Sequence, residues 1–535
     1  MKITIPIGVA ITGVALALAP VIVSCSQTET VDAPEPVVCP TADARLRINI
    51  ASNGFTRAAG ADDAIKTLYI VFYAEDGTFL GKQAATLDSD GTWTCAIPDG
   101  TIPAQCVAFA NLNESQVPGV SLGDLGTVTL DSHMNDIEGT SYFVMSSSRY
   151  FDSDKKECLA ISLDNAKLTG DETVNVYLDR LASKVIVNNI IADGATFETD
   201  FYLNSGSYKI TLNTHIQAWG ITETDAKTYL VKQFGGLNSF DAISNELEGW
   251  TDWNENDKFI SHWAVSPLYQ ETSFPSEANN GKTNIPTANQ IDSNFGEASP
   301  LYCNESTRNE SCFSLTNGLP SIVVKGYYAI KNPSTNEITT MTIYRDPNTG
   351  LCFEDSDGGR SIYALIRTKN MITENRAIDN VTMKRLITLY HPEGEDIPAN
   401  YVVAKFRDDV KLDGDTYSDP SSGTRYTEAD RDELNKRLKA IGYFEQFTNG
   451  QFYYIIPIEH KAGIAGTGKY GLVRNHTYTV TLNSVQGVGY GIYSSETDLM
   501  VEPTGNTVKP YSLKSNITVN GWSAADPQTS DLNRK

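Results

Sequence analysis

The sequence lacks any concentration of basic residues. Lys and Arg number 42 against 66 Asp and Glu in 535 residues, which leaves a net charge of −24. Binding to nucleic acid or to an anionic membrane surface needs a basic face that displaces counterions. No run of Lys and Arg supplies such a face. The composition therefore argues against nucleic acid as a partner.

Phosphate-binding and metal-binding motifs are also missing. The chain contains no P-loop. Its six histidines are scattered and never reach the close spacing of an HExxH zinc site. We therefore expect no enzyme, no cofactor and no metal. Glycosidase carboxylates have no fixed spacing, so that alternative stays open. The Asp-rich loops 355–359 and 413–419 are alternatives for Ca²⁺, although solvated turns explain them better than an EF-hand does.

The cysteines do not form a complete disulfide framework. Without Cys25 their number is odd, and no CxxC pair indicates a redox or zinc motif. Cys303 and Cys312 are close enough in sequence to close a loop, and buried free thiols are an equal alternative for the others.

The N-terminal segment is the one long apolar run. Residues 3–24 are almost entirely apolar, follow Lys2 and end on Ser24, a small residue, directly before Cys25. The pattern resembles a bacterial lipoprotein signal in which Cys25 is lipidated and becomes the new N-terminus. A transmembrane anchor is the alternative, since about 20 apolar residues suffice to span a bilayer. We expect an exported protein with a signal peptide at 1–25 and a propeptide at 26–57.

Short apolar runs separated by turn residues fill most of the remaining chain. Asp76-Gly77 indicates a hairpin turn between two of these runs. One helix is well marked, because Thr427 and Asp430 resemble a capping box and Gly442 supplies a stop. The spacing predicts antiparallel β-sandwiches with helix as the minority. The clearest runs are 65–73, 106–110, 173–178, 184–187, 208–212, 321–325 and 452–456.

The pattern loosens around residues 188–207. We therefore predict an N-terminal β-sandwich domain at 58–190 and a C-terminal domain at 191–535. Long polar stretches in the second domain, notably 271–299, indicate large loops on a sandwich.

Both ends of the chain carry an amphipathic strand pattern. Leu46, Ile48 and Ile50 share one face near the N-terminus. Shortly after them, Arg57-Ala58 lies in a small-residue loop that is open to proteases, so a cut there frees the first strand. Near the C-terminus, Leu513, Ile517 and Val519 alternate with polar residues in the same way. We infer that one strand can take the place of the other.

Several segments together resemble the Bacteroidales fimbrillins, the subunits of the type V pilus, and within them the major subunits of the short fimbriae. The likeness is strongest over about residues 440–523 and looser in the N-terminal half. Its strongest segments are 453–460, 470–478, 487–491 and 517–522; the looser ones include 68–73, 109–112, 145–146 and 178–185.

This resemblance implies a mostly β fold of two transthyretin-like antiparallel β-sandwich domains with a few short helices. It implies lipidation at Cys25, cleavage between Arg57 and Ala58 by an Arg-specific maturation protease, and polymerisation by donor-strand exchange. The donor strand would be about residues 511–522 and would replace the removable strand of Leu46, Ile48 and Ile50.

The resemblance also implies partners and a location. The partners would be copies of the same chain, other fimbrial subunits, the outer membrane through the lipid of the precursor, and host or bacterial surface ligands. The mature subunit would lie in a fimbrium on the cell surface and support adhesion and biofilm formation. The alternatives are a tip or accessory adhesin that binds a ligand through loops such as 271–299, and a lipid-anchored glycan-binding protein. For the shaft subunit we expect Ile517→Asp to block assembly and to spare folding of the uncleaved chain.

Overall fold

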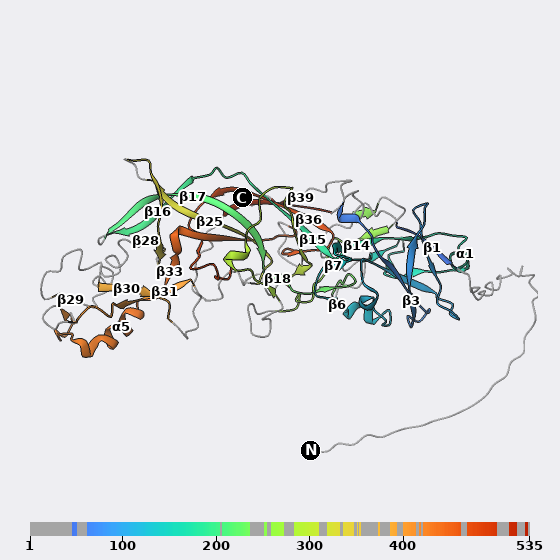
Figure 1. Cartoon of the computed structure of the whole chain (residues 1–535), viewed down its shortest axis with the longest axis horizontal. Helices are drawn as coiled ribbons and strands as arrows, with labels where there is room; N and C mark the ends of the chain where they lie inside the picture. The colour runs from blue at the N-terminus through green and yellow to red at the C-terminus, as the bar shows by residue number, and fades with distance from the viewer. Residues whose placement is uncertain are drawn as a thin grey trace, which may run out of the picture. The chain divides into compact units, whose positions relative to one another are not determined.

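The computed structural model shows a protein built mostly of strands, with few helices (Figure 1). The predicted fold class, mostly β, is confirmed. The residues that the structure describes are 45–50, 61–152, 154–203, 206–235, 251–253, 258–271, 283–309, 318–331, 335–346, 350, 352–354, 373–374, 386–392, 400–412, 417–418, 421–461, 468–499, 513–521 and 530–532.

The first large sheet has nine strands, and the N-terminal strand lies inside it. β1 is parallel to β13 on one side and antiparallel to β4 on the other. β13 and β14, the two ends of the sheet order, are separated in the chain by Tyr177 alone. The order is β13 (Val174–Val176), β1 (Arg45–Ile50), β4 (Trp93–Ala96), β3 (Phe79–Leu87), β2 (Leu68–Tyr73), β5 (Gln105–Ala110), β9 (Met145–Ser147) and β14 (Leu178–Arg180), with β12 (Ile161–Ser162) also paired to β5.

The predicted hairpin between β2 and β3 is present. The two strands are antiparallel, and Gly77 in the turn adopts a φ of +81°, a conformation that glycine tolerates without strain.

Two further sheets enclose a second core. One has five strands: β23 (Leu301–Asn304), β15 (Ala182–Asn189), β36 (His476–Val485), β38 (Leu513–Gly521) and β39 (Ser530–Leu532). The other has eleven: β30 (Ile387–Tyr390), β31 (Tyr401–Phe406), β33 (Phe444–Phe447), β27 (Ile343–Arg345), β28 (Cys352–Glu354), β16 (Ala195–Leu203), β17 (Gly206–Thr222), β25 (Ser321–Lys331), β34 (Gln451–Pro457) and β37 (Tyr490–Gly491), with β26 (Ile338–Thr340) on β25. Val187, Val480 and Ile517 of the first join Val324 and Ile456 of the second in one buried cluster. The two sheets therefore form a sandwich.

Short strands and turns connect these sheets. The four-stranded sheet is β11 (Glu157–Cys158), β10 (Tyr150–Phe151), β21 (Lys258–Ile260) and β20 (Thr251–Trp253); the pairs are β18 (Thr224–Asp225) with β22 (Thr283–Asn284), β19 (Thr228–Tyr229) with β6 (Thr129–Leu130), β24 (Ser306–Thr307) with β35 (Gly471–Leu472), β29 (Thr373–Glu374) with β32 (Tyr417–Ser418), and β7 (Met134–Ile137) with β8 (Thr140–Phe143). The 3-10 turns are η1 (Ala61–Asp63), η2 (Glu114–Gln116), η3 (Asp124–Thr127), η4 (Ala288–Gln290), η6 (Glu428–Asp430) and η7 (Thr448–Gly450).

The chain passes from the first sheet to the second sandwich before residue 190, where the sequence predicts the domain boundary. β14 pairs with β9 in the first sheet, whereas β15 pairs with β23 and β36 in the second sandwich. Only Leu181 separates them. β15 carries three adjacent apolar residues, Val185, Ile186 and Val187, which suit a strand of either sheet, so the sequence pattern gave no sign of the change of sheet.

The α-helices are short. α1 (Asn165–Thr169) packs beside β1, and α5 (Arg431–Lys439) covers a small core with β31. The predicted capping box at Thr427 and Asp430 is present, with the Thr427 amide donating to Asp430 at 2.6 Å. Leu434 and Leu438 form the buried face of α5.

Candidate functional site

β1 is held in its sheet by burial on one face and by backbone pairing on both edges. Leu46 and Ile48 have 0% exposure, and Ile50 is partly buried. Leu46 lies opposite Cys95, and Ile48 lies opposite Trp93 and Val174. Each fully buried side chain of this size contributes about 1.5–3 kcal/mol. Losing β1 would therefore uncover an apolar slot between β13 and β4.

The outward face of β1 adds little to this attachment. Arg47 forms an exposed ion pair with Asp90 at 3.4 Å, and exposed pairs of this kind contribute between about 0 and 1 kcal/mol. Asn49 donates to the side-chain oxygen of Asn175 on β13 at 3.0 Å. Most of the attachment comes from Leu46, Ile48 and the backbone ladders.

The chain that follows the predicted cleavage site is anchored at η1. Arg180 forms a buried ion pair with Asp63 and donates through Nε to the carbonyl of Asp62 at 3.1 Å. Lys184 lies 3.1 Å from the Asp62 carboxylate, and the Tyr302 hydroxyl donates to it at 3.2 Å. Burial lowers the pKa of Arg180 to about 10. η1 is thereby fixed to β14, β15 and β23. Cys25, Arg57 and Ala58 lie outside the described residues, and their roles stay predictions.

A cavity of about 290 Å³ lies where β1 ends. Ile50, Trp93 and Leu178 give it an apolar lining, and Asp63 of η1 borders it. The slot of β1 therefore continues past the last residue of the strand.

β38, the predicted donor strand, is part of the chain's own sandwich. It pairs antiparallel with β36 on one side and with β39 on the other. Ile517 is only 7% exposed and belongs to the core between the two sheets, whereas the side chains of Leu513 and Val519 lie outside the described part. An Asp at position 517 would bury a charge in this core. The expectation that Ile517→Asp spares folding is therefore corrected, and donation of β38 to a neighbour stays a prediction.

Three histidines that the sequence scatters meet beside β36. Nδ1 of His262 lies 3.1 Å from Nε2 of His476, and the ring centroids of His460 and His476 are 5.3 Å apart. Burial lowers the pKa of all three, that of His476 to about 4, and the nearby charge of Lys232 lowers it further. The imidazoles are therefore neutral near pH 7. Sequence spacing could not find this cluster, because its members are distant in the chain.

A second missed feature is a set of buried charges beside β18. Asp225 pairs with Arg308 at 2.6 Å, and Glu305 pairs with Arg474 at 3.0 Å, all of them without exposure. Glu223 is buried at a φ of +61°, and its carboxylate oxygens have no hydrogen-bond partner among the described residues. Burial raises the pKa of Glu223 to about 7 although Arg308 opposes the shift. From the sequence alone, such residues cannot be distinguished from ordinary surface charges.

The described part of the chain offers little support for a disulfide or a metal site. Cys303 is a buried free thiol, so the loop-closing disulfide with Cys312 is not formed. Burial raises the pKa of Cys95 to about 12. Among described residues no group of three or more His, Cys, Asp or Glu is arranged to hold a metal ion. The loops 355–359 and 413–416 lie outside the described part.

The apolar run of residues 3–24 lies outside the described residues. No helix in the described ranges is long and apolar enough to cross a membrane. Trp263 is buried and packs in the core against Tyr269 and His460.

The comparison with known proteins agrees with the resemblance seen in the sequence. Residues 445–527 match the family described as Major fimbrial subunit protein type IV, fimbrillin, C-terminal. This range includes β34, β36 and β38, so the likeness expected over about 440–523 is confirmed. The sequence matches none of the curated proteins.

The solved structures that this chain resembles include proteins from Porphyromonas gingivalis and Parabacteroides distasonis. A fimbrilin from Porphyromonas gingivalis W83 is 13% identical, with 90% of this chain and 98% of that chain covered and a TM-score of 0.35. A putative cell adhesion protein from Parabacteroides distasonis is 12% identical over 89% and 98%, with a TM-score of 0.34. The tip fimbrial protein from Porphyromonas gingivalis with a C-terminal truncation is 10% identical over 83% and 95%, with a TM-score of 0.28. These scores are low, so the family likeness rests on the C-terminal match.

Proposed function

We propose that this chain is a structural, non-enzymatic subunit of a fimbrium on the cell surface. The observation that carries the proposal is the match of residues 445–527 to the fimbrillin C-terminal family. The position of β1 supports it, because a terminal strand held between β13 and β4 can be exchanged for a strand from another subunit.

The proposal includes a maturation sequence. The precursor is exported as a lipoprotein through Cys25 and held at the outer membrane. An Arg-specific protease cuts between Arg57 and Ala58, β1 leaves with the lipid, and the C-terminal strand of a neighbour fills the slot. The contact is head to tail and does not close on itself, so it propagates a filament. The anchored turn η1 keeps the chain after the cut attached to the subunit.

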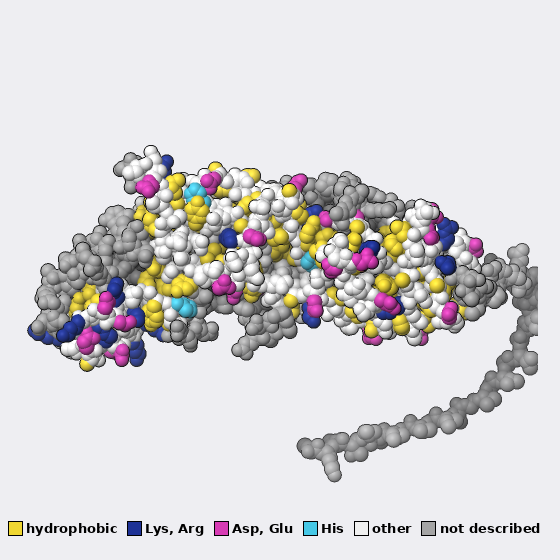
Figure 2. Space-filling view, in the orientation of Figure 1, with side chains coloured by type: hydrophobic (Ala, Val, Ile, Leu, Met, Phe, Trp, Pro, Cys, Tyr) yellow, Lys and Arg dark blue, Asp and Glu magenta, His cyan; other side chains and the backbone are white. Residues whose placement is uncertain are grey.

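The charge of the subunit suits an extended polymer in water. Residues 1–57 contain four basic and four acidic side chains, so the cleaved subunit keeps the net charge of −24. Asp and Glu side chains are spread over the visible face in Figure 2 rather than gathered in one patch. Repulsion between such subunits disfavours lateral clumping.

The first experiment tests processing. Purified precursor, Arg57→Ala and the control Arg47→Ala are treated with an Arg-specific protease, and the products are sequenced from the N-terminus. Wild type and the control should begin at Ala58 and form SDS-resistant ladders, because Arg47 lies in a strand paired on both edges. Arg57→Ala should remain a monomer. Ladders whose subunits retain residues 45–50 contradict the proposal.

The second experiment tests the slot itself. A synthetic peptide of residues 45–50 is added in excess during cleavage and should stop polymerisation by refilling the slot. The same peptide with Leu46→Asp and Ile48→Asp is the matched control, because burying either charge costs several kcal/mol. Equal polymer yield with both peptides contradicts strand exchange at this position.

A tip or accessory adhesin is the alternative that the loop positions favour, since residues 284–293 border a pocket. Antibody labelling of filaments in the electron microscope separates the two. Decoration along the filament indicates a shaft subunit, and labelling only at the ends indicates a tip subunit.

A further inference from the structure

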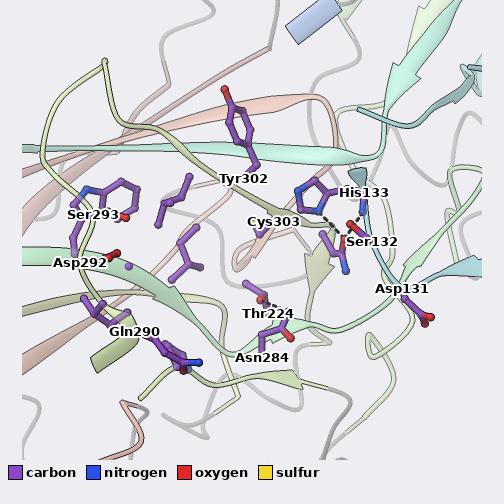
Figure 3. Close-up of a pocket in the computed structure, with 17 residues that line it drawn as sticks. Asp131, Ser132, His133, Thr224, Asn284, Gln290, Asp292, Ser293, Tyr302 and Cys303 are labelled. Carbon is purple, nitrogen blue, oxygen red and sulfur yellow. Dashed lines mark hydrogen bonds between the residues drawn. The ribbon is translucent and has the colours of Figure 1, made fainter. Parts of the chain in front are cut away.

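A cavity of about 390 Å³ opens beside the end of β17 (Figure 3). Its volume falls in the range of about 300–1,000 Å³ that is typical of small-molecule sites. Four separate segments contribute: residues 131–133, the end of β17 with the start of β18, residues 284–293, and β23. One wall therefore comes from the long polar stretch 271–299, which the sequence singles out as a large loop.

The floor of the cavity is apolar and fixed. Trp219, Ile291 and Cys303 are buried and line it. The indole Nε1 of Trp219 donates to the carbonyl of Asn294 at 2.7 Å, which fixes the ring. A Cβ on Gly220 would lie 2.2 Å from Cδ1 of Ile291, so Ile291 rests directly on the backbone of β17. The floor is thus formed before any ligand binds.

The rim carries amides and carboxylates. Asn284 and Gln290 are exposed, and only some of the polar atoms of each side chain form hydrogen bonds within the protein. Nδ2 of Asn284 donates to Thr224 at 3.3 Å, which leaves its oxygen as an acceptor. Oε1 of Gln290 accepts from the Thr287 amide at 2.9 Å, which leaves its NH₂ group as a donor. Asp292 adds an exposed carboxylate.

His133 adds a further acceptor on the wall. Its Nδ1 lies 2.8 Å from Oδ1 of Asn304, while Nδ2 of Asn304 donates to the carbonyl of Asp225 at 3.0 Å. Oδ1 of Asn304 is therefore an acceptor, and Nδ1 of His133 carries the hydrogen. The lone pair of His133 is on Nε2, at the far side of the ring from Asn304.

The chemistry of the lining selects one class of ligand. No Lys or Arg is among the described residues that line the cavity, so no lining side chain carries a positive charge to balance a phosphate, sulfate or carboxylate. Acceptors from His133, Asn284 and Asp292 suit a ligand with several hydroxyl donors, and the apolar floor suits the C–H face of a ring. We propose that this cavity binds a neutral sugar residue.

The inference stands apart from the proposed fimbrial function, because it depends on the cavity alone. The probes are glucose, galactose, mannose, fucose and N-acetylglucosamine, each added to the purified full chain and followed by ligand-observed NMR and titration. Sialic acid, inorganic phosphate and choline complete the panel as charged alternatives. At least one neutral sugar should give saturation transfer and a measurable Kd, and the charged probes should bind more weakly.

Two rim variants test whether binding occurs in this cavity. Asn284→Ala and Asp292→Ala each remove a polar contact at an exposed position, so folding should persist, and Kd should rise about tenfold for Asp292→Ala because a hydrogen bond to a charged group is lost. Asn289→Ala is the matched control, an exposed neighbour that does not line the cavity, and should leave Kd unchanged. The proposal is overturned if no neutral sugar binds, if a charged probe binds most tightly, or if the rim variants bind like the control.

Discussion

Acid will weaken the packing around His476, and the effect can be isolated with His476→Gln. The side chain is 6% exposed, its Nδ1 lies 2.7 Å from the carbonyl of Arg474, and its Nε2 faces His262. Protonation would place a charge in this site beside Lys232, with His460 also close. Gln keeps a polar group at the position and removes the titration.

The magnitude follows from the pKa of His476. Burial lowers it from 6.5 to about 4, and each unit corresponds to about 1.4 kcal/mol. Below pH 6.5 the unfolded chain binds the proton and the folded chain does not, so stability present above pH 6.5 is lost as the pH falls toward 4. By pH 5 the loss from this residue is about 2 kcal/mol.

Glu223 acts with the opposite sign in nearly the same range. Its pKa is raised by burial to about 7, so the folded chain holds the proton that the unfolded chain releases above pH 4.5. Stability from Glu223 is therefore present below pH 4.5 and is lost as the pH rises through 7, by about 2 kcal/mol between pH 5 and 7.5. The two residues nearly cancel in the wild-type chain, so a wild-type pH profile cannot test either.

The assay is urea unfolding of wild type and variants at pH 5 and pH 7.5. The free energy of unfolding of His476→Gln minus that of wild type should be about 2 kcal/mol higher at pH 5 than at pH 7.5, because only the wild type loses stability as the pH falls. Glu223→Gln serves as the internal control, and its difference from wild type should change by a similar amount in the other direction. A His476→Gln difference that is the same at both pH values refutes the reasoning.

Three further predictions concern packing and buried charge. Arg308→Met should destabilise the chain by about 3–5 kcal/mol because Asp225 is left buried without its partner, and adding Asp225→Asn should recover part of the loss in the same urea assay. Gly326→Ala should lower the free energy of unfolding by about 1–3 kcal/mol or more, since its Cβ would lie 2.2 Å from the carbonyl oxygen of His215. Gly119→Ala is the control: the nearest atom to its Cβ would lie 3.6 Å away, so it should unfold at the wild-type urea midpoint. Ile517→Asp should lower the thermal midpoint of the uncleaved precursor, and Thr518→Asp, which is half-buried, should lower it less; equal midpoints would place Ile517 outside the core.

The features that the sequence predicts well are those that adjacent residues determine. The turn at Gly77, the strand alternation of Leu46 and Ile48, and the cap at Thr427 depend on neighbours a few residues away. Turn geometry, side-chain period and capping chemistry are local, so they can be read from the chain without knowing the fold.

The features that it misses depend on residues brought together from far apart. His262 and His476 are separated by 214 positions, and Asp225 and Arg308 by 83. Neither pair has a spacing that indicates contact, and a buried charge looks like a surface charge until its surroundings are known. The change of sheet at Leu181 was missed for a related reason, because the apolar pattern of β15 is the same whichever sheet it joins.

The two-sided pairing of β1 has a mechanical consequence. Tension applied to Arg45 along the axis of β1 shears its hydrogen bonds to β4 and β13 together rather than opening them one after another. A strand at a sheet edge and pulled sideways would unzip bond by bond at lower force. β1 therefore resists a pull along its axis from its N-terminal end. A cut after its C-terminal end does not remove this resistance, because the hydrogen bonds of β1 to β4 and β13 stay in place.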